Sequence, residues 1–270
     1  MRKYIFIDID GTLIDREGNV PKSAFDAIKE ARGKGHKVFI ATGRSRCEIF
    51  DSYLAPGFDG IIGAAGGYVE AEGKVIESNS MTKEESDRII NILENNKIKF
   101  SAETNETVFN NRETQEFLRN VFVSLGRNVE SDLFYNMMTR TESFNNIEGI
   151  NKILYYDTDI TVDEMRKILG DRYTIVPYTI REFGRNSGEI NIKGVTKAKG
   201  IEIILNYFGG SREAAAAIGD GENDIEMLKF ANTAVAMGNS SEKLIKYADF
   251  VTDDVDNNGL SKAIYYIINR

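Results

Sequence analysis

The chain has 270 residues, of which 41% are hydrophobic and 28% are charged, and its net charge is −8 at pH 7. This is the composition of a globular protein of one large or two medium domains, and the acidic balance argues against binding to nucleic acid or anionic membranes. One cysteine, Cys47, and one histidine, His36, exclude an internal disulfide and a Cys/His zinc site. We interpret Cys47 as a small packing residue and His36 as a surface residue or a residue at a strand entry.

The apolar run near the amino terminus is too short for a signal peptide or a membrane span, and no later segment qualifies. We therefore expect a cytoplasmic protein. No sequence feature indicates an obligate protein partner.

The first third of the chain alternates strands and helices. We expect a strand from Tyr4, a helix over 21–32, a strand over 37–41, a helix from Ser45 onward and a strand over 60–64. This β-α-β-α-β order predicts a parallel sheet covered by helices.

The middle of the chain has a different pattern. Capping boxes at Thr82 and Thr161 predict two helix starts, and apolar spacing predicts another helix around Phe117–Leu125. Alternating strands are expected near 98–102, over 151–157 and over 172–179, whereas residues 128–150 fit no clear pattern. Half-polar strands of this kind indicate a sheet with one solvated or cleft-facing side.

The last third returns to the first pattern. We expect helices over 197–208, 223–230 and 241–247 and from Ser261, with strands over 214–218 and 233–237 and near Phe250. The predicted fold class is therefore α/β, a doubly wound, Rossmann-like parallel sheet formed by residues 1–82 and 188–270. Residues 83–187 would form an inserted α/β domain.

Two carboxylates, Asp8 and Asp10, follow the first apolar strand, and Gly11 then permits a sharp turn. Two neighbouring buried charges of the same sign are costly, so this arrangement indicates a bound cation or a reaction. The alternative, a solvated Asp-x-Asp-Gly turn, is equally acceptable for this segment alone.

Three further segments have residues suited to a phosphate group. Thr42-Gly43-Arg44 follows the second strand, Lys197 begins a helix, and Gly219-Asp220-Gly221-Glu222-Asn223-Asp224 follows the strand over 214–218. In an open α/β sheet such strand ends line the ligand crevice. A turn or a solvated helix residue explains any one segment, but not their joint occurrence in this order.

Together these four motifs resemble those of the haloacid dehalogenase superfamily of phosphohydrolases, specifically its Cof-like branch with a large α/β cap. The resemblance spans the chain and implies that the insert is a cap that selects the substrate. One position departs from the family pattern, because Ala65 stands where the family often has Asn.

The resemblance also implies roles for the motif residues. Asp8 would be the nucleophile that forms an aspartyl-phosphate, and Asp10 the general acid and base. Mg²⁺ would be held by Asp8, the Asp10 carbonyl and Asp220, supported by Asp224. Contacts to the phosphate or substrate would come from Thr42, Gly43, Lys197 and Asn223, and Arg44 would be structural.

The function expected from this resemblance is a Mg²⁺-dependent phosphatase of small phosphorylated metabolites, with sugar phosphates foremost. Phosphomutase activity, a nucleotide or flavin phosphate as substrate, and a non-catalytic phosphometabolite-binding regulator remain alternatives. Arg181, Arg185 and Lys193 are candidate substrate contacts, with a solvated hinge as the equal alternative.

Overall fold

The computed structural model describes residues 1–178 and 180–270, which form two compact units. The first unit contains residues 1–44, 49–78 and 195–270, and the second contains residues 45–48 and 79–194. Beyond the predicted insert at 83–187, the second unit also includes residues 45–48, 79–82 and 188–194. Most of 188–194 belongs to it because β11 (Gly188–Ile192) pairs with β9 (Lys152–Tyr156). A substrate-selecting role for this insert stays a prediction.

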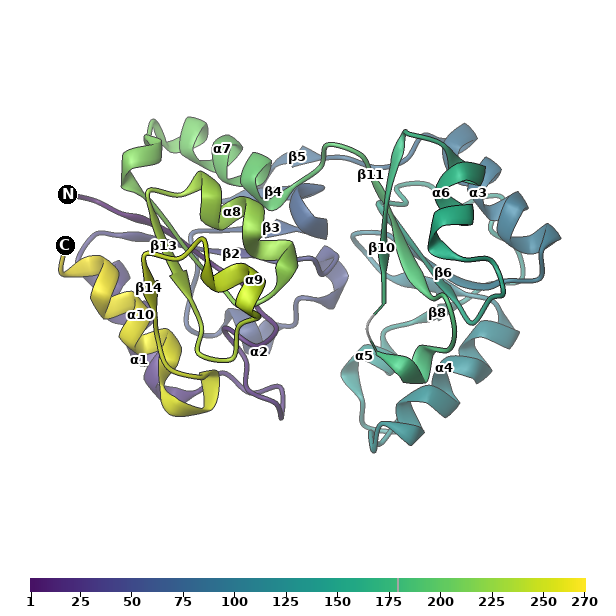
Figure 1. The fold of residues 1–270 in the computed structure, drawn as a ribbon, viewed down its shortest axis with the longest axis horizontal. Coiled ribbons are helices and arrows are strands. Elements are labelled where there is room, and N and C mark those ends of the chain that lie inside the picture. The colour runs from purple at the N-terminus through teal and green to yellow at the C-terminus, as the bar shows by residue number, and fades with distance from the viewer. Residues whose placement is uncertain (179) are drawn as a thin grey trace. The chain divides into compact units, whose positions relative to one another are not determined.

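The first unit is built on an eight-stranded sheet of order β14-β13-β12-β1-β2-β3-β4-β5 (Figure 1). Neighbouring strands from β14 to β3 run parallel. The predicted parallel α/β sheet is therefore confirmed. Its parallel strands are β1 (Tyr4–Ile7), β2 (Lys37–Ala41), β3 (Gly60–Gly63), β12 (Ala215–Gly219), β13 (Thr233–Ala236) and β14 (Phe250–Val251).

Two antiparallel strands that the sequence reasoning missed extend this sheet, β4 (Tyr68–Ala71) and β5 (Lys74–Ser78). Glu72 and Gly73 join them and both have positive φ, 50° and 75°. Positive φ at both central residues is typical of the tight turns that connect hairpins. Because Glu72 is not a usual residue for this conformation, the segment carries only a weak hairpin signal.

Helices cover both faces of the sheet, because alternate residues of each strand point to opposite sides. Ile5 and Ile7 pack with α1 (Lys22–Gly33) and α10 (Gly259–Ile268), whereas Tyr4 and Phe6 lie in a second core. That second core includes α7 (Lys197–Phe208), α8 (Ile225–Phe230) and α9 (Glu242–Ile245). The two cores hold the central strands in place, so the loops after them have fixed origins.

The predicted helix from Ser45 onward is wrong. The chain forms a single 3₁₀ turn over Arg46–Glu48 and then a short helix, α2 (Asp51–Leu54). Phe50 between them is extended, with φ −74° and ψ 154°. Ser45, Arg46, Cys47 and Glu48 belong to the second unit, where the Ser45 hydroxyl donates to Glu103 over 2.6 Å. This tertiary contact replaces the continuous helix.

The second unit contains a six-stranded sheet of order β10-β11-β9-β6-β7-β8, antiparallel except for the β7–β8 pair. The predicted strand over 172–179 contains β10, and Thr179 lies outside the described residues. The strands not yet given are β6 (Lys99–Glu103), β7 (Val108–Asn110), β8 (Thr139–Arg140) and β10 (Tyr173–Pro177).

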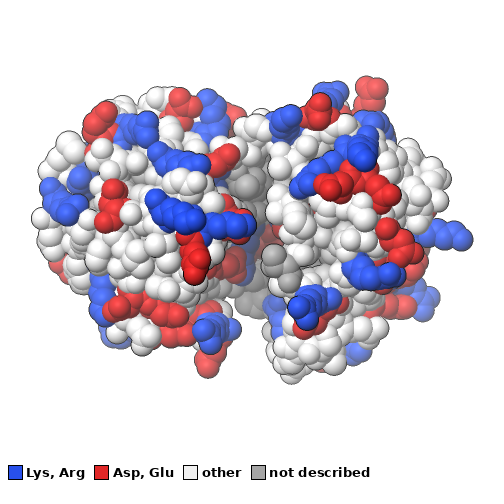
Figure 2. Space-filling view, viewed as in Figure 1, with Lys and Arg blue, Asp and Glu red and all other residues white. Residues whose placement is uncertain are grey.

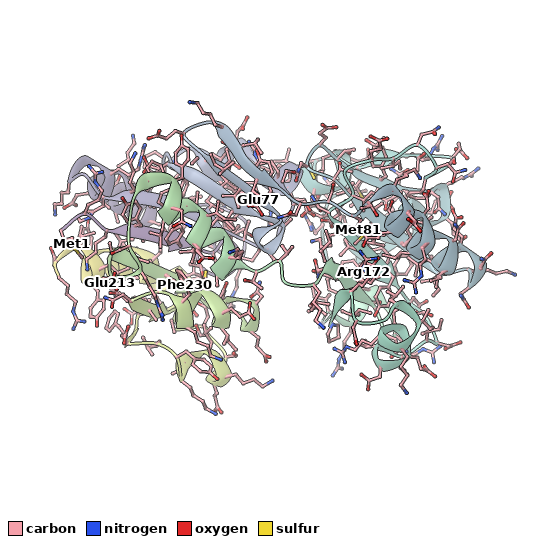
Figure 3. The ribbon with its side chains drawn as sticks, turned by 90° about the horizontal axis from the view of Figure 1, so that it is seen from above. Met1, Glu77, Met81, Arg172, Glu213 and Phe230 are labelled. Atoms are coloured by element: carbon pink, nitrogen blue, oxygen red, sulfur yellow. The ribbon has the colours of Figure 1, made fainter. Side chains whose placement is uncertain are left out.

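Both predicted capping boxes of the second unit are confirmed, at Thr82 and Thr161. They begin α3 (Lys83–Asn95) and α6 (Val162–Leu169), and the other helices are α4 (Arg112–Ser124) and α5 (Leu133–Asn136). Met81 joins the core beneath α3, and Arg172 pairs with Glu85 over 2.6 Å. Met81 and Arg172 are labelled in Figure 3.

Charged side chains of both signs are interspersed on the face of each unit drawn in Figure 2. Among the described residues, every helix is too short or too polar to cross a bilayer.

Candidate active site

Three neighbouring strands of the first unit end in the predicted motif residues. In the sheet, β1 lies between β12 and β2, and Asp8, Asp220 and Thr42 directly follow β1, β12 and β2 respectively. The carboxyl ends of parallel strands meet at one edge of a sheet, and that edge is where ligands bind in open α/β folds. The topology thus brings together residues that are more than 200 positions apart.

Lys197 lies at the centre of this group. Its ammonium is 2.6 Å from Asp8 Oδ1 and 2.5 Å from Asp224 Oδ1, and none of the three side chains is more than 5% exposed. Lys197 is the first residue of α7, where the Thr196 hydroxyl caps the helix by accepting from the Lys199 amide. A buried lysine needs such partners, because an uncompensated charge in the interior is costly.

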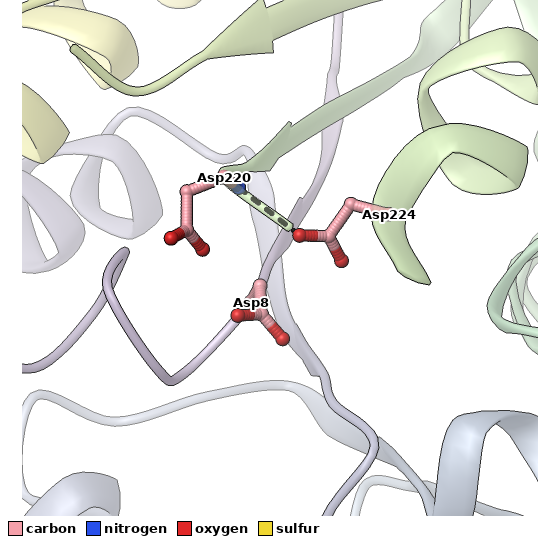
Figure 4. Close-up of side chains that lie close together, drawn as sticks. All are labelled: Asp8, Asp220 and Asp224. Atoms are coloured by element: carbon pink, nitrogen blue, oxygen red, sulfur yellow. Dashed lines mark hydrogen bonds between the residues drawn. The ribbon is translucent and has the colours of Figure 1, made fainter. Parts of the chain in front are cut away.

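Asp224 has both carboxylate oxygens engaged. Oδ1 accepts from Lys197, and Oδ2 accepts from the backbone amides of Asp220 and Gly221, each over 3.0 Å; the bond from Asp220 is drawn in Figure 4. Gly219 makes this approach possible, since a Cβ there would lie 2.5 Å from the Asp224 carboxylate. Asp224 therefore orients Lys197 and the loop that carries Asp220.

Asp220 receives two side-chain hydrogen bonds that sequence reasoning missed. Thr12 Oγ1 donates to Oδ1 over 3.4 Å, and Asn239 Nδ2 donates to Oδ2 over 3.1 Å. Gly11 has φ 74°, and a Cβ there would lie 2.3 Å from Asp220 Oδ2. Asn239 follows the carboxyl end of β13, so a polar residue at a parallel strand end was the available signal.

One carboxylate oxygen each of Asp8, Asp220 and Asp224 lies within 4.8 Å of the other two (Figure 4). Burial and the nearby Asp224 raise the pKa of Asp8 well above its ordinary value against the opposing effect of Lys197, and the same two causes raise the pKa of Asp220 to about 6. Although burial opposes its charge, Asp224 and Asp8 raise the pKa of Lys197. Three carboxylates around one ammonium leave excess negative charge.

This donor set fits a hard divalent cation. All the available atoms are oxygens, and a cation would offset the negative charge that Lys197 leaves uncompensated. Because Asp224 is already engaged on both oxygens, Asp8 and Asp220 are the carboxylates best placed to be direct ligands. Mg²⁺ prefers few carboxylates, and this arrangement meets that preference.

Asp10 lies outside this buried group, and its side chain is 60% exposed. Arg44 donates to both of its oxygens, from Nη2 over 2.6 Å and from Nε over 2.9 Å. The same guanidinium lies 5.2 Å from the ring centroid of Tyr53 and donates to its hydroxyl over 3.4 Å. Arg44, interpreted from the sequence as structural, is thus a direct partner of the predicted general acid.

The other predicted contact residues lie around the same strand ends. Thr42 is buried, and its hydroxyl accepts from the Arg44 amide over 3.2 Å. Asn223 Nδ2 would lie 3.7 Å from a Cβ built on Gly43, so the second and fourth motifs are adjacent. Ala65 has φ 52° and donates its amide to the Thr42 carbonyl over 2.9 Å. An Asn is well suited to that left-handed conformation.

The basic residues predicted as substrate contacts lie in the second unit. Arg181 begins a 3₁₀ turn over Arg181–Phe183, and the Lys193 amide donates to the Arg172 carbonyl. Arg185 pairs with Asp159 over 2.8 Å, with both side chains largely exposed. A contact from these residues to a substrate stays a prediction.

Comparisons with known proteins identify the family of this chain. A family model described as haloacid dehalogenase-like hydrolase matches residues 5–264. The protein YkrA of Bacillus subtilis (strain 168), which is named provisionally as a phosphatase, is 30% identical to this chain. The match covers 97% of this chain and 96% of YkrA. A solved subclass IIB sugar phosphatase of the haloacid dehalogenase superfamily superposes with a TM-score of 0.75, at 27% identity over 98% of each chain. An Arabidopsis thaliana protein named as the chloroplastic endoribonuclease YBEY is 29% identical over 97% of this chain, which covers only 46% of that protein's length.

Proposed function

The chain belongs to the haloacid dehalogenase-like hydrolase family, and we propose that it is a Mg²⁺-dependent phosphatase of small phosphorylated metabolites, with sugar phosphates as the leading substrate class. We further propose that the reaction passes through an aspartyl-phosphate on Asp8. The observation that carries the proposal is the buried Asp8 carboxylate, 2.6 Å from the Lys197 ammonium and beside Asp220 and Asp224. A carboxylate is a weak nucleophile, and it can attack an anionic phosphate only where positive charge offsets the repulsion.

In the first step, an Asp8 oxygen forms a bond to phosphorus while the bond from phosphorus to the leaving alcohol breaks. Asp10 gives its proton to the departing oxygen, so the products are the alcohol and an acyl phosphate. Lys197, the Thr42 hydroxyl and the Gly43 amide would bind the phosphoryl oxygens, on which negative charge accumulates. Mg²⁺ held by Asp8, Asp220 and the Asp10 carbonyl would supply further charge compensation when bound.

In the second step, Asp10 takes a proton from water, whose oxygen attacks phosphorus and releases phosphate and the Asp8 carboxylate. The Arg44 contact to both Asp10 oxygens would hold this carboxylate in one orientation. The partly exposed position of Asp10 suits a residue that exchanges protons with the leaving group and with water.

The proposal is supported most directly by the similarity to a sugar phosphatase across 98% of the chain. Three aromatic rings of the second unit, Tyr156, Tyr178 and Phe183, are packed on one another. Tyr156 and Tyr178 both stack on Phe183, with ring centroids 5.6 and 5.0 Å from it. These rings are therefore engaged within the fold and are not free to stack on a base or flavin.

The test is release of inorganic phosphate from a panel of phosphorylated sugars, nucleotides and flavins by the wild type and by Asp8→Asn. Asn keeps the shape of the side chain but removes the nucleophile, so turnover should fall at least about a thousandfold with folding intact. Asp26→Asn, a change at an exposed carboxylate paired with Lys22, is the matched control and should leave turnover unchanged.

Near-normal turnover by Asp8→Asn would contradict the covalent mechanism. Asp10→Asn should still form the acyl phosphate from esters with activated leaving groups, which need little acid catalysis. Appearance of an isomeric phosphate ester without released phosphate would indicate a phosphomutase. Binding of phosphorylated ligands without any turnover would indicate the regulator.

A further inference from the structure

The sheet of the second unit has one buried face that is polar. Along β6, Phe100 and Ala102 point into the apolar core that α3 and α6 cover, so the alternate residues Ser101 and Glu103 point to the other face. Both polar residues are fully buried. Because buried polar atoms are almost always hydrogen-bonded, the partners on this face show whether the fold satisfies it.

A group of charged side chains occupies one part of this polar face. Glu103 Oε2 accepts from the Ser45 hydroxyl over 2.6 Å and lies 3.0 Å from the Lys152 ammonium. Lys152 is in turn 4.0 Å from Glu189. Although burial opposes its charge, Glu103, Glu189 and Glu48 raise the pKa of Lys152. Three carboxylates around one ammonium leave this face with negative charge, so it does not attract an anion.

Three uncharged side chains continue the group along β6, β7 and β9. The Ser101 hydroxyl donates to Asn110 Oδ1 and lies 2.9 Å from the Tyr156 hydroxyl. A serine hydroxyl has a single proton, so Tyr156 is the donor of the second bond. Burial raises the pKa of Tyr156, so its hydroxyl keeps the proton for this bond. These donors orient the Asn110 amide with Oδ1 toward Ser101, which leaves Nδ2 to find another partner.

Two buried atoms of the polar face have no such partner. In residues 1–178 and 180–270, neither Asn110 Nδ2 nor Glu103 Oε1 has a hydrogen bond, and both residues are fully buried. In the register of β6 and β7, Glu103 lies opposite Val108 and is therefore the diagonal neighbour of Asn110, with about 7–8 Å between the two positions. The fold thus leaves an unused donor and an unused acceptor near each other on one face.

This pair of atoms selects a chemical class of ligand. A hydroxyl group can accept from Asn110 Nδ2 and donate to Glu103 Oε1, whereas a fully ionised phosphate offers only acceptors and an ammonium only donors. The separation of the two positions suits neighbouring hydroxyls of one polyol or sugar. Water also donates and accepts, so a buried water is the alternative occupant.

The polar face reaches the surface at β11. Asn191 pairs with Lys152 and Glu189 with Leu154 in the register of β11 and β9, so both polar side chains of β11 lie on the same face as Lys152. The Glu189 side chain is 28% exposed, and Asn191 is partly exposed. The buried atoms are therefore continuous with polar side chains at the surface of the second unit.

We propose that Glu103 and Asn110 form a site for the hydroxyl groups of a polyol or sugar. The inference rests on the proposed function in one respect, that the ligand carries the phosphate that is hydrolysed. Ser101 would be a positioning residue, because it orients the Asn110 amide, and Lys152 would hold the Glu103 carboxylate in place. The excess of carboxylates would disfavour a ligand with a second phosphate beside these hydroxyls.

The test measures binding to the full-length Asp8→Asn protein by isothermal titration calorimetry, so that the ligand is not consumed. The probes are sorbitol 6-phosphate and hexyl phosphate, which have the same carbon chain with and without hydroxyls. We expect sorbitol 6-phosphate to bind more tightly. Hexyl phosphate would displace water and leave Asn110 Nδ2 and Glu103 Oε1 without partners.

Asn110→Leu keeps the branched shape of the side chain and should weaken binding of sorbitol 6-phosphate about tenfold, with little effect on hexyl phosphate. Tyr155→Phe is the matched control, because it also removes a buried atom that has no hydrogen bond within residues 1–178 and 180–270, but on the apolar face of the same sheet. It should change neither affinity. If Asn110→Leu fails to fold by circular dichroism, Glu103→Gln takes its place, with an expected loss of several-fold.

Three results would overturn the proposal. Unchanged binding of sorbitol 6-phosphate in a folded Asn110→Leu protein would mean that a buried water fills the site. Equal losses for both probes would mean that the change does not act through hydroxyls, and tighter binding of hexyl phosphate before any change at Asn110 would exclude a hydroxyl site.

Wild-type turnover of 4-nitrophenyl phosphate, an ester without hydroxyls, tests the proposed catalysis separately. Its absence, together with a selective loss of sorbitol 6-phosphate binding in Asn110→Leu, would count against the proposed function and support the hydroxyl site. Normal turnover with no selective loss would count against the hydroxyl site alone.

Discussion

Replacing Asp220 by Asn should stabilise the metal-free protein at neutral pH. Burial and the Asp224 charge raise the pKa of Asp220 from its ordinary value of 3.8 to about 6. A raised pKa means that the ionised form is disfavoured in the folded state. The cost is absent below pH 3.8, grows between pH 3.8 and 6, and is fully present above pH 6.

Raising the pKa of Asp220 from 3.8 to about 6 corresponds to about 3 kcal/mol, since a tenfold change in the acid equilibrium is worth 1.36 kcal/mol. Asp220 is partly exposed, and screening by solvent reduces this to about 1–2 kcal/mol. Asn fits the site, because its oxygen can accept from Asn239 and its amide can donate to the Thr12 hydroxyl. Asp220→Asn should therefore raise the free energy of unfolding by about 1–2 kcal/mol at pH 7.5.

The measurement is urea unfolding followed by circular dichroism, because the chain has no tryptophan for fluorescence. In EDTA the gain should be present at pH 7.5 and mostly lost at pH 4.5. With Mg²⁺ at about 100 times its Kd, the wild type should gain about 2.7 kcal/mol and the variant much less, so their order reverses. Asp26→Asn should change stability by no more than about 0.5 kcal/mol under either condition.

A variant that is less stable than the wild type in EDTA at pH 7.5 would refute the electrostatic reasoning. Equal stabilisation of the wild type and the variant by Mg²⁺ would refute the assignment of Asp220 as a ligand.

Three further predictions concern turnover. Chelation should abolish activity and Mg²⁺ should restore it, whereas Ca²⁺, which takes more ligands in looser geometry, should restore little; full activity in EDTA would contradict the metal site. Arg44→Gln should release Asp10 and lower kcat for alkyl phosphates about tenfold, with a changed pH profile and a smaller loss for aryl phosphates. Tyr53→Phe, which removes the hydroxyl that Arg44 contacts, should have a milder effect. Equal losses for both ester types would argue against a positioning role for Arg44. Replacing Arg181 and Arg185 by Ala should lower kcat/KM for the best metabolite selectively over a small aryl phosphate, and an equal effect on both would mean that these arginines do not contact the substrate.

Local patterns predicted most of the elements around the candidate site. The apolar run before Asp8, the capping boxes at Thr82 and Thr161 and the helix from Lys197 all have the predicted type. The parallel α/β fold and the phosphatase family are likewise confirmed. The helices and strands depend on side-chain periodicity and capping within a few residues, so the sequence alone determines them, whereas the family was recognised from the resemblance of the four motifs.

Other elements depended on distant contacts. The region after Ser45 has helical spacing, but its chain is held by Glu103 in the second unit. β11 pairs with strands that come earlier in the chain, and β4 and β5 join through a turn without the usual residues. Register and pairing are set by the partner strand, so a local pattern does not reveal them.

The chemistry of the site divides in the same way. The sequence alone determined which residue types follow the parallel strands, since strand ends and their carboxylates can be recognised locally. Only the tertiary structure decided the partners of these residues. Lys197 bridges Asp224 and Asp8, which is 189 positions away. Arg44 contacts Asp10, and Asn239 contacts Asp220. The reason is physical, because burial and charge compensation are properties of the packed arrangement, and that arrangement joins segments from both ends of the chain.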